Sequence, residues 1–227
     1  MTQQYHFTLP QHEAMGLEDF LPSPSNEEAV RWLLQTAPAQ WSSHAFVLSG
    51  AAGSGKTHLL SIWSAQQGAQ RVTLGDPVLA AIVKGKTPAP AFALDNADAC
   101  AGNPAHEEWL QHFYNATKAA NLPVLLTAET PVAQWGLTLR DIETRLKSGA
   151  AASLLPPDDE LMRGLLLKQF RDRQLLVEAG VVDYLAARLE RTSEAVRCGV
   201  SLLDEAALAG GRKISIPFAQ KILDLSN

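Results

Sequence analysis

The residue types best suited to chemistry stand together in residues 50–57, Gly-Ala-Ala-Gly-Ser-Gly-Lys-Thr. This segment matches the phosphate-loop spacing G-x-x-x-x-G-K-[ST] at every fixed position. Its glycines let backbone N–H groups face phosphate oxygens, and a helix starting here adds its positive end. Lys56 would contact the β- and γ-phosphates, and the Thr57 hydroxyl would bind Mg²⁺. The segment predicts a site for ADP or ATP formed by Gly50, Gly53, Ser54, Gly55, Lys56 and Thr57.

A single carboxylate follows a second apolar run, in residues 91–95, Ala-Phe-Ala-Leu-Asp. At the carboxyl end of a buried strand, Asp95 can hold Mg²⁺ directly or through water; a helix N-cap is the structural alternative. An ATPase of this class would have a second acid at the next position. The chain has Asn96 there, whose amide cannot act as a base or an acid at neutral pH. Asp98 could position water or cap the next segment. We therefore expect weak intrinsic ATPase at most.

The elements that must position these residues alternate up to residue 156. Apolar runs predict strands at 45–49, 71–74, 91–94, 123–127 and 151–155, the second of them at a sheet edge. A helical pattern precedes the first strand at 27–35, where Ser25-Asn26 can cap the helix. Further helical patterns lie between the strands at 56–66, 107–120 and 139–147.

After Pro156-Pro157 only helical patterns follow, at 158–173, 178–189, 193–209 and 215–224. This order predicts a parallel α/β sheet flanked by helices, followed by a small all-helical domain. We expect an extended tail over residues 1–15, the nucleotide-binding domain over 16–156 and a helical lid over 157–227.

The bulk composition excludes several classes of protein. The chain has 227 residues, is 46% hydrophobic and carries a net charge of −5, which does not suit a general nucleic-acid binder. Two cysteines make no disulfide framework or metal site. The first residues lack a signal peptide's basic and apolar regions, and no apolar run approaches the roughly 20 residues of a membrane span. We expect a cytoplasmic protein without membrane contact.

Seven segments, met in order, together carry a resemblance to a known family. They are FLPSPSN (20–26), GSGKTHLL (53–60), LDNAD (94–98), LLTAETP (125–131), LRDIETRLKSG (139–149), AVRCGVSLLDEA (195–206) and RKISIPFAQKIL (212–223). They resemble the AAA+ module of the DnaA family of bacterial initiators over residues 4–224. The Asn after Asp95 and the C-terminal segment are most similar to the family's short paralogues, the Hda group. The resemblance implies an AAA+ sheet with a helical lid.

The resemblance also implies roles for single residues. Thr127 matches sensor I, near the γ-phosphate, and Arg197 matches the arginine of sensor II, which contacts the phosphates of its own subunit. Arg145 matches the arginine finger of box VII, which acts in trans on the nucleotide of a neighbouring subunit. His58 continues the initiator phosphate loop beside the nucleotide, although a histidine inside a helix is also a packing residue.

Both arginines have structural alternatives. Arg145 could be a surface residue or pair with a nearby acid such as Glu143. Arg197 could form an ion pair with Glu194 or Asp204.

The N-terminal residues 4–9, Gln-Tyr-His-Phe-Thr-Leu, resemble the clamp-binding peptide of the Hda group. The Gln4 amide would fix one end, and Tyr5, Phe7 and Leu9 would enter an apolar pocket of the DNA-polymerase sliding clamp. Tyr5, Phe7 and Thr8 depart from the usual pattern. The alternative is that this tail packs on its own domain.

The resemblance implies a replication regulator that binds the clamp and stimulates ATP hydrolysis by DnaA. The chain ends at Asn227, so we expect no C-terminal DNA-binding domain and no sequence-specific DNA recognition. Three alternatives stay open: an AAA+ ATPase that loads or remodels a replication partner and assembles as a nucleotide-dependent homo-oligomer, a small-molecule kinase, and a nucleotide-gated binding module for another protein.

Overall fold

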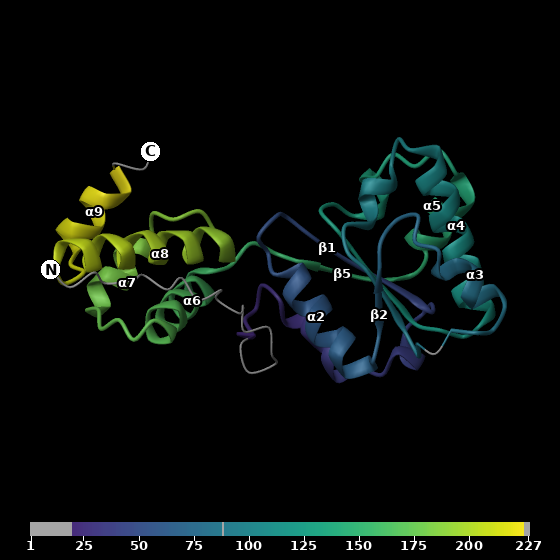
Figure 1. Cartoon of the computed structure of the whole chain (residues 1–227), viewed down its shortest axis with the longest axis horizontal. Helices are drawn as coiled ribbons and strands as arrows, with labels where there is room; N and C mark the ends of the chain where they lie inside the picture. Colours follow the sequence, from purple (N-terminus) through teal and green to yellow (C-terminus); the bar gives the residue numbers. More distant parts are fainter. Residues whose placement is uncertain (1–19, 88, 225–227) are drawn as a thin grey trace, which may run out of the picture.

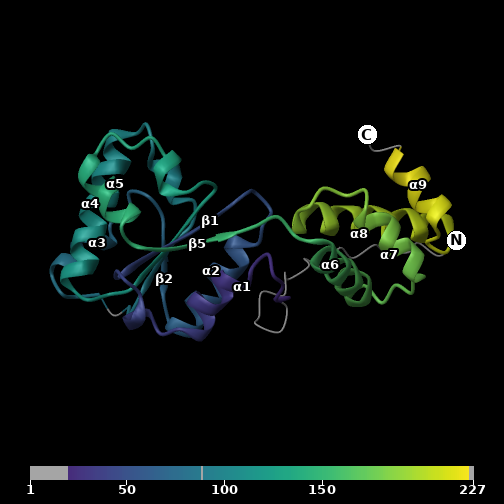
Figure 2. The same cartoon turned by 180° about the vertical axis from the view of Figure 1, so that it is seen from behind.

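The computed structural model describes residues 20–87 and 89–224. Two parts are visible: a sheet with helices on both faces, and a group of helices that follows the last strand (Figure 1). Figure 2 shows the same two parts from behind, with strand β5 (Ala150–Leu154) leading into the helical group. This is the predicted fold class, a parallel α/β sheet followed by a helical lid.

The sheet has five parallel strands in the order β2-β3-β4-β1-β5. The strands are β1 (Ala45–Gly50), β2 (Gln70–Val72), β3 (Phe92–Leu94), β4 (Val124–Ala128) and β5 (Ala150–Leu154). The predicted edge strand, β2, does lie at an edge. In the centre, Leu48 of β1 pairs with Thr127 of β4 and with Ala152 of β5. Because all strands run the same way, their carboxyl ends form one edge of the sheet.

The central strands are apolar because helices cover both faces of the sheet. Successive side chains point to opposite faces. In β1, Val47 therefore joins the cluster beneath α3 (Val78–Val83), α4 (Pro104–Ala119) and α5 (Arg140–Lys147). Phe46 and Leu48 join the cluster beneath α1 (Glu27–Val30) and α2 (Lys56–Gln67). The two layers are visible on either side of the sheet in Figure 1.

The helices of the sheet part are α1 (Glu27–Val30), α2 (Lys56–Gln67), α3 (Val78–Val83), α4 (Pro104–Ala119) and α5 (Arg140–Lys147). The first predicted helix is divided, because α1 passes into a π-helical turn over Arg31–Gln35. Asn26 occupies the predicted N-cap position, but its side chain makes no hydrogen bond to the helix. It accepts instead from Ser23 N at 2.9 Å.

Two further helices differ from the sequence prediction. α4 begins earlier than expected because Asn103 caps it, accepting from His106 N at 3.3 Å, and Pro104 fits the first turn. α3 was not predicted. It is a short apolar segment that starts where the Asp76 carboxylate accepts from Val78 N at 2.8 Å, and six apolar residues give too little periodicity to distinguish a helix from a strand.

The lid has its own core. Its helices are α6 (Asp159–Asp172), α7 (Ala179–Ala186), α8 (Ser193–Gly210) and α9 (Ile216–Asp224). Fully buried residues from three of them, such as Leu166, Leu185 and Val200, pack together. Asp158 and Thr192 cap α6 and α8 with their side chains. Within the ranges that the structure describes, no helix combines the length and apolar character needed to cross a membrane.

Candidate nucleotide site and arginine edge

The phosphate loop joins the end of β1 to the start of α2, as predicted. Gly53 and Gly55 have φ of 71° and 97°, a region that glycine enters without a Cβ penalty. The buried Lys56 donates from Nζ to Gly50 O at 2.7 Å and to Ala51 O at 2.9 Å. These bonds hold the ammonium group inside the curve of the loop, where it can meet a phosphate.

One polar atom of this loop lacks a partner. The Ser54 hydroxyl is buried and makes no hydrogen bond with any part of the chain that the structure describes. Buried hydroxyls are normally satisfied. An unmatched hydroxyl within a loop of this spacing therefore fits a phosphate oxygen as its partner.

Asp95 directly follows β3 and contacts three other elements, α2, β2 and β4. Its Oδ2 accepts from the Thr57 hydroxyl of α2 at 2.9 Å and lies 3.5 Å from Arg71 NH2 of β2. Its Oδ1 accepts a short hydrogen bond from the buried Thr127 hydroxyl of β4. The N-cap alternative for Asp95 is wrong, since the following 3₁₀ turn, Ala97–Cys100, has Asn96 at its N-cap. The structure thus brings the Mg²⁺ and sensor I candidates, Thr57, Asp95 and Thr127, into one hydrogen-bonded group.

Asn96 has a backbone role. Its φ of 53° and ψ of 51° are left-handed, a conformation that asparagine tolerates better than most residues. Its N–H donates to Thr127 Oγ1 at 3.0 Å, while the residue itself is exposed. The nearby Asp98 does not cap the next turn; its carboxylate accepts from Glu129 N at 2.8 Å beyond β4. Asn96 therefore fixes the end of β3 without supplying a proton acceptor.

The protein's own ligands for Mg²⁺ are few. Thr57 and Asp95 offer oxygens, and the described residues contain no group of three or more His, Cys, Asp or Glu that could hold a metal. Mg²⁺ usually takes one or two carboxylates and fills its octahedral shell with substrate phosphates and water. The site thus fits an ion that arrives with the nucleotide, and the adjacent Arg71 offsets the charge of Asp95.

The lid reaches the phosphate loop through the start of α8. Ser193 N donates to Gly53 O at 3.0 Å. A Cβ on Gly53 would lie 2.7 Å from the Cβ of Thr192, so only glycine allows this approach. Arg197 lies one turn further along α8 and is 3.8 Å from Glu194. Of the two acids considered as partners for Arg197, the structure brings Glu194 to it.

His58 packs beside the phosphate loop. Its ring meets Phe20 edge-on, with the centroids 5.5 Å apart. The structure therefore gives His58 a packing contact, which was the alternative to a nucleotide contact, and brings Phe20 of the first matching segment to the start of α2.

Arg145 lies at the other end of the strands from the phosphate loop, where their amino ends meet; we call this side the amino edge of the sheet. It stands in the last turn of α5, next to Ser43 and His44, which precede β1. β1 has six residues at about 3.3 Å each, so roughly 20 Å separates the two edges. Arg145 cannot reach the phosphate loop of its own chain.

The neighbours of Arg145 differ from the sequence expectation. Its Nε donates to both carboxylate oxygens of Asp141 at 2.9 Å, and these bonds hold the pKa of Asp141 below its ordinary value. Glu143, the expected partner, instead pairs with Arg140 and Lys147. The difference follows from helix geometry, because Asp141 is four residues from Arg145 whereas Glu143 is two residues away.

Sequence reasoning missed Glu107, a fully buried carboxylate of α4. It accepts from Thr138 N and Oγ1 at 2.8 and 2.7 Å, from Leu139 N at 3.0 Å and from Gly102 N at 3.3 Å. Burial alone raises the pKa of Glu107, but these hydrogen bonds outweigh it and the net pKa is lowered. The sequence feature that could have revealed Glu107 is its spacing: it lies on the same apolar face of the helix as Leu110 and Tyr114. Glu107 fixes the segment from which α5 starts.

The predicted clamp-binding residues Gln4, Tyr5, Phe7 and Leu9 lie outside the described residues. Their role stays a prediction.

Comparisons with known proteins agree with the two-part architecture. A family model described as "Hda, lid domain" matches residues 158–223. Domain III of the replication initiation protein DnaA from Thermotoga maritima superposes with a TM-score of 0.79 at 18% identity, covering 95% of this chain and 98% of that one. AMPPCP-bound DnaA from Aquifex aeolicus gives 0.67 at 19% identity, over 88% of this chain and 67% of that one.

A second group of similar structures is represented by the Thermotoga maritima RuvB Holliday junction branch migration motor. It gives a TM-score of 0.72 at 17% identity, over 93% of this chain and 72% of that one. The sheet-and-lid fold is thus one that different AAA+ modules share. The family-model match is more specific, because it concerns the lid of the Hda group alone. Residues 158–223 therefore match the lid domain of the Hda group, and the chain as a whole has the sheet-and-lid fold of DnaA domain III.

Proposed function

We propose that the protein binds a nucleotide, docks on the sliding clamp and stimulates ATP hydrolysis by DnaA in the cytoplasm, so that re-initiation of replication is prevented. The observation that carries this proposal is the separation of Arg145 from the phosphate loop of its own chain by the length of the sheet. An arginine finger at this edge acts on a nucleotide held by a neighbour. In the Hda-type arrangement that neighbour is DnaA–ATP.

The nucleotide bound by this chain stabilises the conformation that acts on DnaA. The loop over Gly50–Thr57 surrounds the phosphates, Thr57 and Asp95 hold Mg²⁺, and Arg197 on α8 closes from the lid. Similar DnaA structures carry AMPPCP, which supports nucleotide binding at this loop. Because Asn96 is not a base, we infer that hydrolysis in this chain is weak. The resemblance to the Hda group suggests ADP as the resident form.

The proposed Mg²⁺ site yields a prediction for Arg71. Its guanidinium lies 3.5 Å from Asp95 Oδ2 and donates to Ser61 Oγ at 3.3 Å, so it partly replaces the charge that a divalent ion would supply. In Arg71→Ala we expect ADP affinity to depend on Mg²⁺ about tenfold more strongly than in the wild type, as one lost charged hydrogen bond would allow. Titration with a fluorescent ADP analogue, with Mg²⁺ or with EDTA, measures this.

Arg31→Ala is the matched control, since Arg31 lies on the π-helical turn and its guanidinium stacks over the ring of Trp32, 5.9 Å from the centroid. An equal response to EDTA in wild type and Arg71→Ala would contradict the role of Arg71.

The whole proposal is tested by one assay. The protein is mixed with clamp-loaded DNA and DnaA–ATP, and phosphate release is followed. We expect release to depend on the protein, the clamp and DNA together. If DnaA–ATP is hydrolysed no faster with the complete mixture than without the protein, the proposed function is wrong.

The tail gives a separate prediction. We expect Gln4→Ala, Phe7→Ala and Leu9→Ala combined to abolish capture of purified clamp in a pull-down, because the amide and both apolar side chains are lost. Nucleotide binding should not change. His12→Ala, outside the matching segment, is the control. Clamp capture by the triple variant at the wild-type level would show that the tail is not the contact.

A second candidate function is an AAA+ ATPase that loads or remodels a replication partner. The similarity to the RuvB motor favours it. It requires robust ATP turnover by this chain and nucleotide-dependent self-assembly. Asn96 argues against robust ATP turnover. The steady-state ATPase rate and the sedimentation coefficient in the presence of ATP distinguish the two candidate functions.

A further inference from the structure

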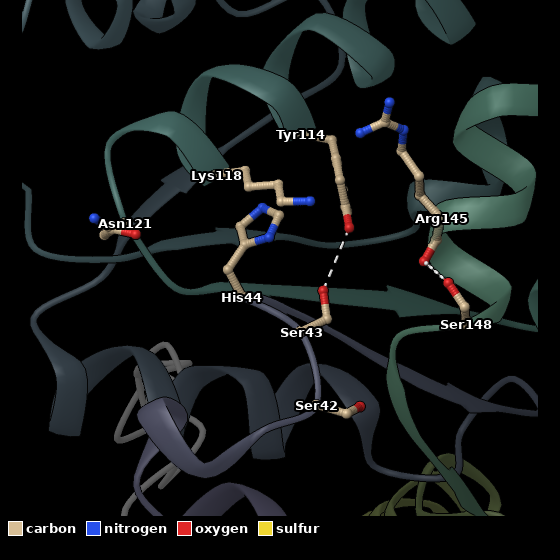
Figure 3. A pocket seen from close by; sticks show the side chains of 8 residues that line it. All are labelled: Ser42, Ser43, His44, Tyr114, Lys118, Asn121, Arg145 and Ser148. Carbon is tan, nitrogen blue, oxygen red and sulfur yellow. Dashed lines mark hydrogen bonds between the residues drawn. The ribbon is translucent and has the colours of Figure 1, made fainter.

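A pocket of about 350 Å³ lies beside Arg145 at the amino edge of the sheet. We call it the amino-edge pocket. Three segments meet there: the residues before β1, the last turns of α4 and the end of α5 (Figure 3). The residues that matter for its chemistry are Ser43, His44, Tyr114, Lys118, Arg145 and Ser148.

The pocket is positively charged although the chain is not. Its lining includes two cations, Lys118 and Arg145, and no acid, whereas the whole chain has a net charge of −5. Arg145 donates from Nε to Asp141, and in the described part of the chain its two terminal nitrogens form no hydrogen bond, so both can bind a second, bidentate acceptor. Lys118 has no ion pair with any residue in the described part of the chain. Figure 3 shows the two cations on either side of Tyr114.

Hydroxyl groups and a neutral ring complete the lining. Ser43 and Tyr114 share a hydrogen bond at 3.3 Å, and Ser148 donates to Arg145 O at 3.1 Å. Burial lowers the pKa of His44 to about 4, an effect that a backbone hydrogen bond at Tyr114 opposes and the charge of Lys118 increases. His44 Nδ1 is buried without a hydrogen-bond partner among the described residues. Cations, hydroxyls and a neutral imidazole together suit a phosphate-bearing anion.

A purely structural role for the cations must be weighed against this. Lys118 and Arg145 each stand in the last turn of a helix, where a positive charge offsets the helix dipole. That role explains their presence near the two helix ends. It does not explain why both line one pocket with hydroxyls and no acid, and it predicts effects on folding alone.

We propose that the amino-edge pocket receives the phosphates of the nucleotide held by the neighbouring AAA+ subunit, with Lys118 as a second phosphate-binding cation beside Arg145. This inference rests on the proposed function and adds to it a residue and a binding surface. Arg145 contacts the terminal phosphate, and Lys118, on the other side of Tyr114, binds an adjacent phosphate oxygen.

The first test uses the full mixture of protein, clamp-loaded DNA and DnaA–ATP. We expect Lys118→Met to lower stimulated phosphate release by about tenfold, the loss of one charged hydrogen bond. Lys118→Arg should keep most of it, and Lys86→Met, an exposed lysine elsewhere, should behave as wild type. Thermal denaturation of each variant separates this from a structural role, which predicts a lower melting temperature and unchanged stimulation.

The outcomes distinguish the inference from the function. If Lys118→Met stimulates like wild type while Arg145→Ala does not, the inference is wrong and the proposed function stands. If both variants stimulate like wild type, the proposed function fails as well.

The second test examines the pocket directly. The protein, saturated with ADP so that its own phosphate loop is filled, is titrated with tripolyphosphate or inorganic phosphate while the His44 ring resonances are followed by NMR. We expect tripolyphosphate to shift them in wild type and not in Lys118→Met. An equal shift with inorganic phosphate would assign the pocket to free anions, and no shift with either would overturn the phosphate assignment.

Discussion

Arg145→Ala is expected to abolish stimulation of DnaA–ATP hydrolysis, with a loss of about 10³-fold or more, the range found for arginine fingers. The guanidinium stabilises charge that develops on the γ-phosphate, and among the described residues that line the amino-edge pocket Arg145 is the one arginine. ADP binding by the variant should equal wild type, because Arg145 lies an entire strand length from the phosphate loop of its own chain. Phosphate release and ADP titration together measure both halves of this expectation.

Three variants sharpen the result. Arg145→Lys should also fail, since an ammonium group does not reproduce the planar fork. Asp141→Asn should lose part of the stimulation, because Asp141 orients the guanidinium through Nε. Arg140→Ala is the matched control: Arg140 lies on the same helix and its side chain is largely exposed. Stimulation by Arg145→Ala at the wild-type level would exclude a finger at this position.

Glu107→Ala is expected to destabilise the fold by about 3 kcal/mol or more, since each hydrogen bond to a charged group contributes about 1.5–3 kcal/mol. Thr138, Leu139 and Gly102 all donate to this carboxylate. The loss should also loosen the start of α5 and so weaken the placement of Arg145. Urea denaturation gives the free energy of unfolding, and Glu108→Ala, the exposed neighbour, is the control.

The same carboxylate predicts a pH dependence. The pKa of Glu107 is lowered in the folded protein from its ordinary value of 4.5. Its contribution is therefore complete above that value and is lost as the pH falls through the lower, folded pKa. The stability difference between wild type and Glu107→Gln should narrow below about pH 4.5. A difference that stays constant from pH 7 to pH 3 would show that the ionised carboxylate is not what holds this segment.

The sequence by itself determined the phosphate loop, the alternation of strands and helices and the change to helices after Pro156-Pro157. These are local signals: glycine spacing, apolar runs and prolines act within a few residues. The short helix α3 was the exception, because Val78–Val83 is as apolar as a buried strand and shorter than two full turns of helix. Only packing against α4 decides its state.

The tertiary structure decided which residues meet. No local pattern places Arg71 beside Asp95, or Lys118 in one pocket with Arg145, because these contacts depend on the strand order β2-β3-β4-β1-β5. From the sequence, Asn96 stood where an ATPase would have a second acid. The structure shows a left-handed backbone at this position, which explains locally why an asparagine is suited to it. The direction of the strands puts the phosphate loop and Arg145 at opposite edges, and that separation is set by the length and parallel arrangement of the sheet.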